Sequence, residues 1–177
     1  MVRWCAGHPL TMRTDAMFPT VFRGEILWIA QKEPSVGDVV QVDLGGEYGL
    51  YRIAASQGQT IELKEKKLYI DGTRAGLGPA RTVQAPKVDC EFAHVPAVTA
   101  RIAGRTFEFL PGGGDARALV PDGSFFLLGD HRSLAGDSRA WGPLVETSIQ
   151  GVATRVLWSW DACKSAVRWH RLWNSIE

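Results

Sequence analysis

Short runs of β-branched and aromatic residues recur along the chain, and Gly, Pro, Asp or Ser closes each run nearby. Runs of this length and composition are typical of β-strands, whereas helical periodicity is rare in this sequence. The first set of expected strands covers residues 25–30, 39–44, 50–54, 60–63 and 67–70, and the second set covers residues 106–110, 124–128, 152–160 and 166–169. The pattern therefore predicts a mainly β protein with antiparallel strands.

A stretch rich in Pro, Ala and Gly separates the two sets of strands. Such a change in composition is typical of an inserted segment. We therefore expect a core sheet domain formed by residues 1–72 and 122–177, with a smaller inserted β domain over residues 73–121. Three consecutive glycines at 112–114 predict a turn, because the Gly-Lys-Ser/Thr of a phosphate-binding loop does not follow them.

Composition narrows the class of protein. Hydrophobic residues make up 45% of the 177 residues and charged residues 22%, which is typical of a globular chain. The formal net charge is +1, and no basic stripe is present, so nucleic acid is not an expected partner. The apolar runs are far shorter than the roughly 20 residues that span a bilayer. No cofactor and no metal site are expected, because no His or Cys residues have metal-ligand spacing.

Three cysteines, at positions 5, 90 and 163, allow at most one disulfide. Their odd number and lack of paired spacing favour free thiols as the simpler interpretation. The first ten residues lack the apolar core of a secretory signal.

Four motifs carry the chemistry of the chain. They are TDAMFPT at 14–20 followed by GE at 24–25, GDVVQV at 37–42, YRI at 51–53 continuing to LYIDG at 68–72, and GDHR at 129–132 with GDSRAWGP at 136–143. Their order and content resemble the conserved boxes of the type I signal peptidases, which are serine peptidases with a Ser/Lys dyad. The resemblance covers the chain from about residue 14 to 160. It implies the antiparallel β fold of that family, with a small domain inserted between the third and fourth boxes.

The residues that perform the reaction in this family are replaced here. By resemblance, Ala16 stands at the position of the nucleophilic serine, Tyr51 at that of the lysine base, and Ala135 at that of a serine that orients the lysine. Alanine has no atom that attacks a carbonyl, and a phenol with a reference pKa near 10 is protonated at neutral pH. We therefore expect the family fold without peptidase activity.

Other site features are retained, according to the resemblance. Thr14 and the backbone N–H of Ala16 correspond to the oxyanion hole. The pairs Arg52 with Asp130 and Asp137 with Arg139 correspond to structural ion pairs. An extended peptide or preprotein segment is the expected ligand, held by main-chain hydrogen bonds, and the residues expected to line its groove are Met17, Pro19 and Asp130.

Other functions stay open. One is a working signal peptidase I whose serine was replaced in the laboratory, or whose base is supplied by Lys32 or Lys66. Another is a non-catalytic scaffold or regulator on a membrane protease complex. A third starts from the Gly-Asp-Ser run at 136–138, which superficially matches a lipase-like hydrolase with His131 or His170 as base, but its position in the chain is wrong for that family.

The resemblance implies a place on the extracytoplasmic face of a membrane. A membrane surface is therefore a second expected partner, and Trp158, Trp160, Trp169 and Trp173 with Lys164, Arg168 and Arg171 give the C-terminal region an interfacial composition. The alternative interpretation of this cluster is a set of core aromatics. With no spanning or signal segment, a complete chain would be cytoplasmic.

Overall fold

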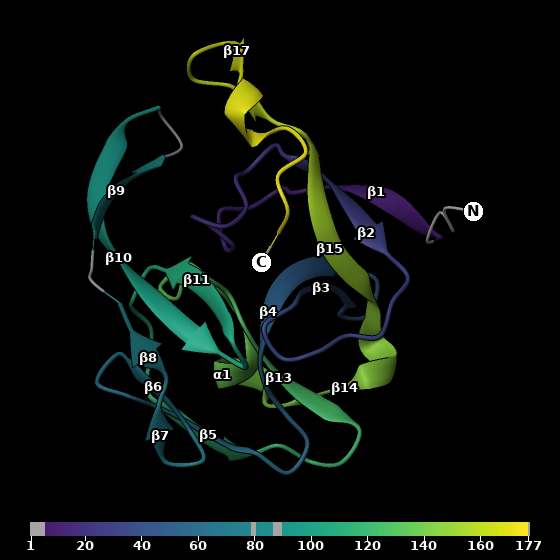
Figure 1. Cartoon of the computed structure of the whole chain (residues 1–177), viewed down its shortest axis with the longest axis vertical. Helices are drawn as coiled ribbons and strands as arrows, with labels where there is room; N and C mark the ends of the chain where they lie inside the picture. The colour runs from purple at the N-terminus through teal and green to yellow at the C-terminus, as the bar shows by residue number, and fades with distance from the viewer. Residues whose placement is uncertain (1–5, 79–80, 87–89, 177) are drawn as a thin grey trace.

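The computed structural model describes residues 6–78, 81–86 and 90–176. Its largest unit is a seven-stranded sheet in which every pairing is antiparallel (Figure 1). In spatial order the strands are β1 (Gly7–Thr11), β2 (Ile26–Ala30), β15 (Ile149–Trp158), β3 (Val39–Asp43), β4 (Tyr48–Ser56), β13 (Ser124–Leu128) and β14 (Leu144–Val145). The expected antiparallel, mainly β fold is confirmed.

Two four-stranded sheets lie beside the main sheet (Figure 1). One consists of β12 (Ala116–Leu119), β5 (Thr60–Lys64), β6 (Lys67–Ile70) and β7 (Thr73–Arg74). In the other, the long strand β10 pairs with each of its neighbours, which are β8 (Gly76–Leu77), β9 (Arg81–Pro86) and β11 (Arg105–Phe109); β10 itself covers Phe92–Ile102.

Two-residue turns with positive φ connect several of these strands. Glu65 and Lys66 join β5 to β6, Asp71 and Gly72 join β6 to β7, and Ala103 and Gly104 join β10 to β11. Both central residues of each turn have φ above zero, which matches the right-handed twist of the flanking strands.

The remaining elements are short. A helix, α1 (Ser138–Trp141), lies within the fourth motif, and two 3-10 turns are η1 (Glu146–Ser148) and η2 (Trp169–Arg171). The small hairpin of β16 (Trp160–Asp161) and β17 (Ala166–Val167) lies at the top of Figure 1. No helix among residues 6–78, 81–86 and 90–176 is long and apolar enough to cross a bilayer.

A disulfide joins Cys90 to Cys163, and the preference for free thiols was therefore wrong. The bond links the start of β10 to the β16–β17 hairpin across 73 residues of sequence. Cys5 lies outside the described residues.

The core packs between the sheets. One cluster of buried side chains joins the main sheet to the two smaller sheets through residues such as Ile61, Phe107 and Phe126. A second cluster lies behind the first motif and includes Met17, Leu27 and Val39. Burying such apolar surface contributes roughly 25 cal/mol per Å², so these clusters hold the four motifs in fixed positions.

The strand predictions differ from the structure mainly in the segment before residue 106. The eleven-residue strand β10 and its partner β9 were missed, because prolines and alanines weaken the local β signal there. Near the C-terminus, residues 166–169 form only the two-residue strand β17 followed by η2.

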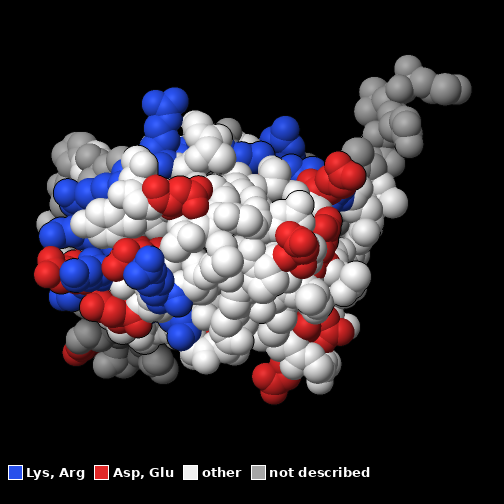
Figure 2. All heavy atoms as spheres, turned by 90° about the horizontal axis from the view of Figure 1, so that it is seen from below, with Lys and Arg blue, Asp and Glu red and all other residues white. Residues whose placement is uncertain are grey.

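The expected domain division stays a prediction. Strands β7 and β12 belong to residues 73–121, yet they pair with β6 and β5 from the expected core domain. Figure 2 shows the molecule from below the view of Figure 1. On that face, basic residues gather at one side together with acidic ones, and an uncharged area lies beside them.

Candidate functional site

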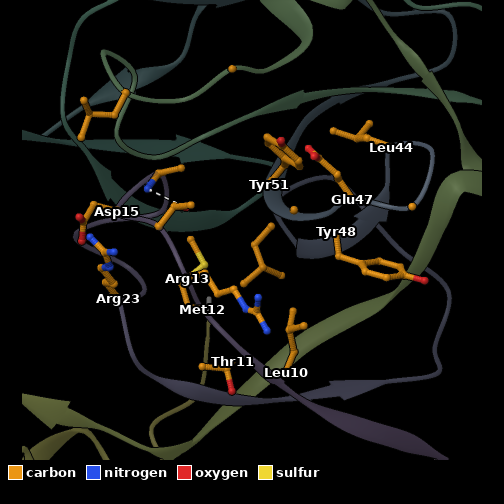
Figure 3. A pocket seen from close by; sticks show the side chains of 17 residues that line it. Leu10, Thr11, Met12, Arg13, Asp15, Arg23, Leu44, Glu47, Tyr48 and Tyr51 are labelled. Atoms are coloured by element: carbon orange, nitrogen blue, oxygen red, sulfur yellow. Dashed lines mark hydrogen bonds between the residues drawn. The ribbon is translucent and has the colours of Figure 1, made fainter.

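A groove of 880 Å³ opens beside the first motif. One wall is the chain from Leu10 to Ala16, which continues from the edge strand β1. The opposite wall is the end of the β3–β4 hairpin, with Leu44, Glu47 and Tyr48. Figure 3 shows Leu10, Thr11 and Met12 across the groove from Leu44, Glu47 and Tyr48, and Tyr51 next to Glu47. Leu134 and Gly136 of the fourth motif also line the groove.

The two positions of the expected dyad and the expected orienting position meet at one end of this groove. Ala16 and Tyr51 line it directly, and Ala135 lies between the lining residues Leu134 and Gly136. A Cβ atom at Gly129 would collide with the Cβ of Ala135 and would lie 2.9 Å from the carbonyl oxygen of Ala16. Glycine at 129 is thus required for residues 16 and 135 to approach each other.

A backbone hydrogen bond joins the first motif to the fourth. The N–H of His131 donates to the carbonyl oxygen of Ala16 at 2.9 Å, and the N–H of Ala135 donates to the carbonyl of His131 at 3.0 Å. The imidazole of His131 is half-buried, and its Nδ1 has no hydrogen-bond partner among the described residues. Burial lowers the pKa of His131, and a backbone hydrogen bond and the charge of Asp15 oppose that shift only in part.

Tyr51 occupies the place of the expected base. Its side chain is buried, and its ring packs edge-on against Trp141 with the ring centroids 5.8 Å apart. Burial raises the pKa of Tyr51, and the charges of Asp137 and Glu47 raise it further. The phenol is therefore protonated at neutral pH. The hydroxyl of Tyr51 makes no hydrogen bond to the described residues.

The geometry of the expected oxyanion hole is incomplete. The N–H of Ala16 points at the hydroxyl oxygen of Thr14, 3.4 Å away. Two donors that share one carbonyl oxygen must both point at that oxygen, and here one donor points at the other instead. A peptide carbonyl would therefore have to replace the Thr14 contact before it accepted from both groups.

Arg52 and Asp130 form a two-pronged ion pair directly behind the site. Nε and Nη2 of Arg52 donate to the two carboxylate oxygens of Asp130 at 2.9 and 2.8 Å, and both side chains are completely buried. Arg52 also donates to the carbonyl of Gly37 at 2.8 Å and to the hydroxyl of Thr20. Its guanidinium lies 4.1 Å from the centre of the Phe107 ring. One side chain thus connects all four motifs and strand β11.

A second ion pair shapes the fourth motif. Asp137 accepts from Nε of Arg139 at 2.7 Å and from the backbone N–H of Gly129 at 3.0 Å. Arg139 in turn donates to the carbonyls of Arg132 and Gly112. Arg132 is fully buried, and this burial lowers its pKa to about 10. The charges of Asp130 and Asp137 act in the opposite direction but are outweighed. These contacts hold the loop that carries Ala135.

Three residues expected to line the peptide groove do not line it. Met17 and Asp130 are completely buried, and Pro19 follows a cis peptide bond away from the groove lining. The missed lining residues are mainly Leu10, Thr11 and Arg13 on one wall and Tyr48 to Leu50 on the other. The sequence pattern around residue 50 predicted the strand that forms the second wall. Only the pairing of the strands places that wall opposite the first one.

The alternative bases Lys32 and Lys66 and the alternative nucleophile Ser138 do not line the groove. Lys32 binds Asp38 at 3.3 Å, Lys66 lies in the β5–β6 turn, and neither lines the groove. Ser138 is buried, and its hydroxyl accepts the N–H of Leu127, so it is not presented to a substrate. The described residues hold no cluster of His, Cys, Asp and Glu that could bind a metal ion.

Known proteins share this sequence pattern. The family described as signal peptidase, peptidase S26, matches residues 1–158. A probable signal peptidase I-1 of Synechocystis sp. is 28% identical over 169 residues, which cover 86% of this chain and 72% of the relative. Signal peptidase IB of Staphylococcus aureus is 27% identical over 165 residues, which cover 88% of this chain and 80% of the relative.

Among solved structures, a signal peptidase I from Enterococcus faecalis is similar over 68% of this chain and 97% of its own, with 20% identity and a TM-score of 0.44. The family match alone spans far more than half of the sequence. The chain therefore belongs to the signal peptidase family, peptidase S26.

Proposed function

We propose that this protein binds an extended peptide in the groove between Leu10–Ala16 and the β3–β4 hairpin without cleaving it. The observation that carries the proposal is the identity of the two side chains at the end of the groove. Ala16 offers no nucleophile, and the buried phenol of Tyr51 offers no base. None of the described residues that line the groove is a lysine.

Two strand edges face the groove. The backbone N–H of Met12 donates to the carbonyl of Glu25, and the carbonyl of Met12 accepts from the N–H of Gly24. Because backbone groups alternate in direction along an extended chain, the N–H and C=O groups of Thr11 and Arg13 point away from β2. Pro9, which has no N–H, lies on the same outward edge. This edge has no strand partner among the described residues.

The other wall offers a similar edge. Ile53 exchanges backbone hydrogen bonds with Gly37 and Asp38, so Tyr48 and Leu50 point their backbone groups away from β3. Strand β13 pairs with β4 only from Arg52 onward. A peptide strand inserted here would bond to both walls through its main chain, which gives affinity without a specific side chain.

A binding assay with matched variants tests the proposal. The probe is a fluorescent peptide that spans the cleavage region of a signal peptide, and anisotropy measures its affinity. Arg13→Pro removes one groove-facing N–H, whereas Arg13→Ala keeps it. We expect the proline variant to bind roughly ten-fold more weakly than the alanine variant, the equivalent of one hydrogen bond.

Cleavage of the same peptide is followed in parallel by mass spectrometry. We expect an intact peptide after long incubation. Cleavage at one defined bond that persists after repurification would overturn the non-cleaving function. Equal binding by the two Arg13 variants would overturn main-chain recognition.

We further propose that the groove works at the extracytoplasmic surface of a membrane. Trp169 and Trp173 are 73% and 66% exposed, so this aromatic cluster is not part of the core. The disulfide also suits an oxidising compartment. Co-sedimentation with anionic phospholipid vesicles is expected, and Trp169→Ser with Trp173→Ser should reduce it. A wild-type protein that stays in the supernatant would contradict this location.

A further inference from the structure

A second cavity of 770 Å³ lies between the first motif and the C-terminal hairpin. Asp15 and Arg23 line both this cavity and the groove, so the two spaces meet at these residues. Figure 3 shows both side chains at the end of the groove opposite Tyr48. An extended peptide that passes Ala16 therefore continues toward the second cavity.

The disulfide is part of the cavity wall. Cys90 and Cys163 both line the cavity, and their Cα atoms are 5.3 Å apart. The bond holds the β9–β10 hairpin, which contributes Gln84, next to the β16–β17 hairpin. The width of the cavity thus depends on a covalent link between two distant parts of the chain.

Aromatic and charged groups complete the lining. The Cζ atom of Arg168 lies 5.0 Å from the centre of the Phe22 ring. The guanidinium of Arg168 also forms an ion pair with Asp161. Both of these charges are therefore already neutralised. The side chains of Lys164 and His170 also line the cavity, and neither has a hydrogen-bond or ion-pair partner among the described residues.

Arg23 at the junction is likewise exposed and without a partner among the described residues, whereas Asp15 contributes one carboxylate there. Beyond the junction, the uncompensated groups are a lysine and a histidine. A ligand with an acidic side chain complements them.

We infer that this disulfide-walled cavity binds the continuation of the peptide held in the groove and favours an acidic residue there. The inference rests on the proposed peptide binding. It adds a second contact region and a charge preference, both of which depend on residues near the C-terminus.

Peptides of different length distinguish binding in the groove alone from additional binding in the second cavity. A short peptide covers the groove alone, and longer versions carry four more residues at either end, with either two glutamates or two lysines. For one of the two ends, we expect the glutamate extension to bind roughly five-fold more tightly than the lysine extension, as one partly exposed charge pair allows.

Charge reversal identifies the lysine responsible. Lys164→Glu should remove the preference for the glutamate extension, while Lys66→Glu, which changes the net charge equally but lies in the β5–β6 turn, should keep it. Reduction of the disulfide should weaken binding of the extended peptide more than that of the short one.

Binding of the short peptide without any effect of extension, or with equal effects of glutamate and lysine, would overturn the second contact region and leave the proposed function intact. Failure of every peptide to bind would overturn both.

Discussion

The ring of Tyr51 lies directly against Gly49, two residues earlier on the same face of β4. A Cβ atom at residue 49 would lie 2.6 Å from Cε2 of the ring and 2.8 Å from its hydroxyl oxygen. Such contacts are too short for a real side chain, so glycine leaves the space that the phenol fills. Trp141 packs against the ring as well. The neighbours of Tyr51 therefore accommodate its ring at the end of the groove.

Gly49→Ala should lower the free energy of unfolding by roughly 1–3 kcal/mol, because the new methyl group overpacks against Tyr51. In a Tyr51→Ala background the same change should cost much less, since the ring is gone. Urea denaturation of the four proteins of this double-mutant cycle measures the coupling. An equal cost in both backgrounds would mean that the strain comes from the backbone instead.

Breaking the buried ion pair should have a larger effect. Asp130→Asn leaves the completely buried guanidinium of Arg52 without its charge partner, which we expect to cost about 3–5 kcal/mol. Lys67→Met breaks an exposed pair with Glu65 and should cost less than about 1 kcal/mol. Chemical denaturation compares the two variants. A similar, small loss in both would contradict the role of the pair as the link between the motifs.

Much of this architecture could be predicted from sequence, because it depends on local patterns. The β-branched runs predicted most strands of the main sheet, whereas the contact of Arg52 with Asp130 was implied by the resemblance of the motifs to the signal peptidase family. The strand β10 was missed because Pro96 and several alanines hide its β character, while pairing with β9 and β11 stabilises it. Tertiary pairing overrides weak propensity in such segments.

The groove and the disulfide depend on contacts between distant residues. The outward edges of Thr11 and Leu50 follow from strand register, which no local pattern states. Cys90 and Cys163 are 73 residues apart, and their meeting requires the β16–β17 hairpin to reach β10. The buried position of Met17 likewise depends on how the sheets pack against each other.

The stability of the protein should depend on pH through His131. Its folded-state pKa lies below the ordinary 6.5 because burial disfavours the charged imidazole. The unfolded state therefore binds the proton first as the pH falls below about 6.5, and stability is lost on acidification. His131→Gln should flatten the dependence of the unfolding free energy between pH 7 and 5. His94→Gln, at an exposed position, controls for the loss of an imidazole, and an unchanged slope in His131→Gln would contradict the assignment.

The disulfide should contribute substantially to stability. By loop-closure entropy, a bond across 73 residues restrains the unfolded chain by about 4 kcal/mol. Cys90→Ser with Cys163→Ser should therefore lower the melting temperature, and a reducing agent should have the same effect on the native protein but none on the double variant. Mass spectrometry after alkylation counts the free thiols. Alkylation of both residues without prior reduction would show that the bond does not form.

Restoring the dyad should require more than one substitution. Ala16→Ser alone should remain inactive, because the pKa of Tyr51 is raised and its protonated phenol cannot accept the serine proton. Ala16→Ser combined with Tyr51→Lys and Ala135→Ser places a nucleophile, an amine and an orienting hydroxyl around the end of the groove, where burial lowers the pKa of a lysine. Cleavage of a signal-peptide substrate should then exceed that of the single variant by at least about 100-fold, the contribution of a positioned base. Ala16→Ser with Tyr51→Met, which provides a chain of similar length without the amine, is the matched control. Full activity of the Ala16→Ser variant alone would reveal a base outside the dyad position and would end the assignment of Tyr51.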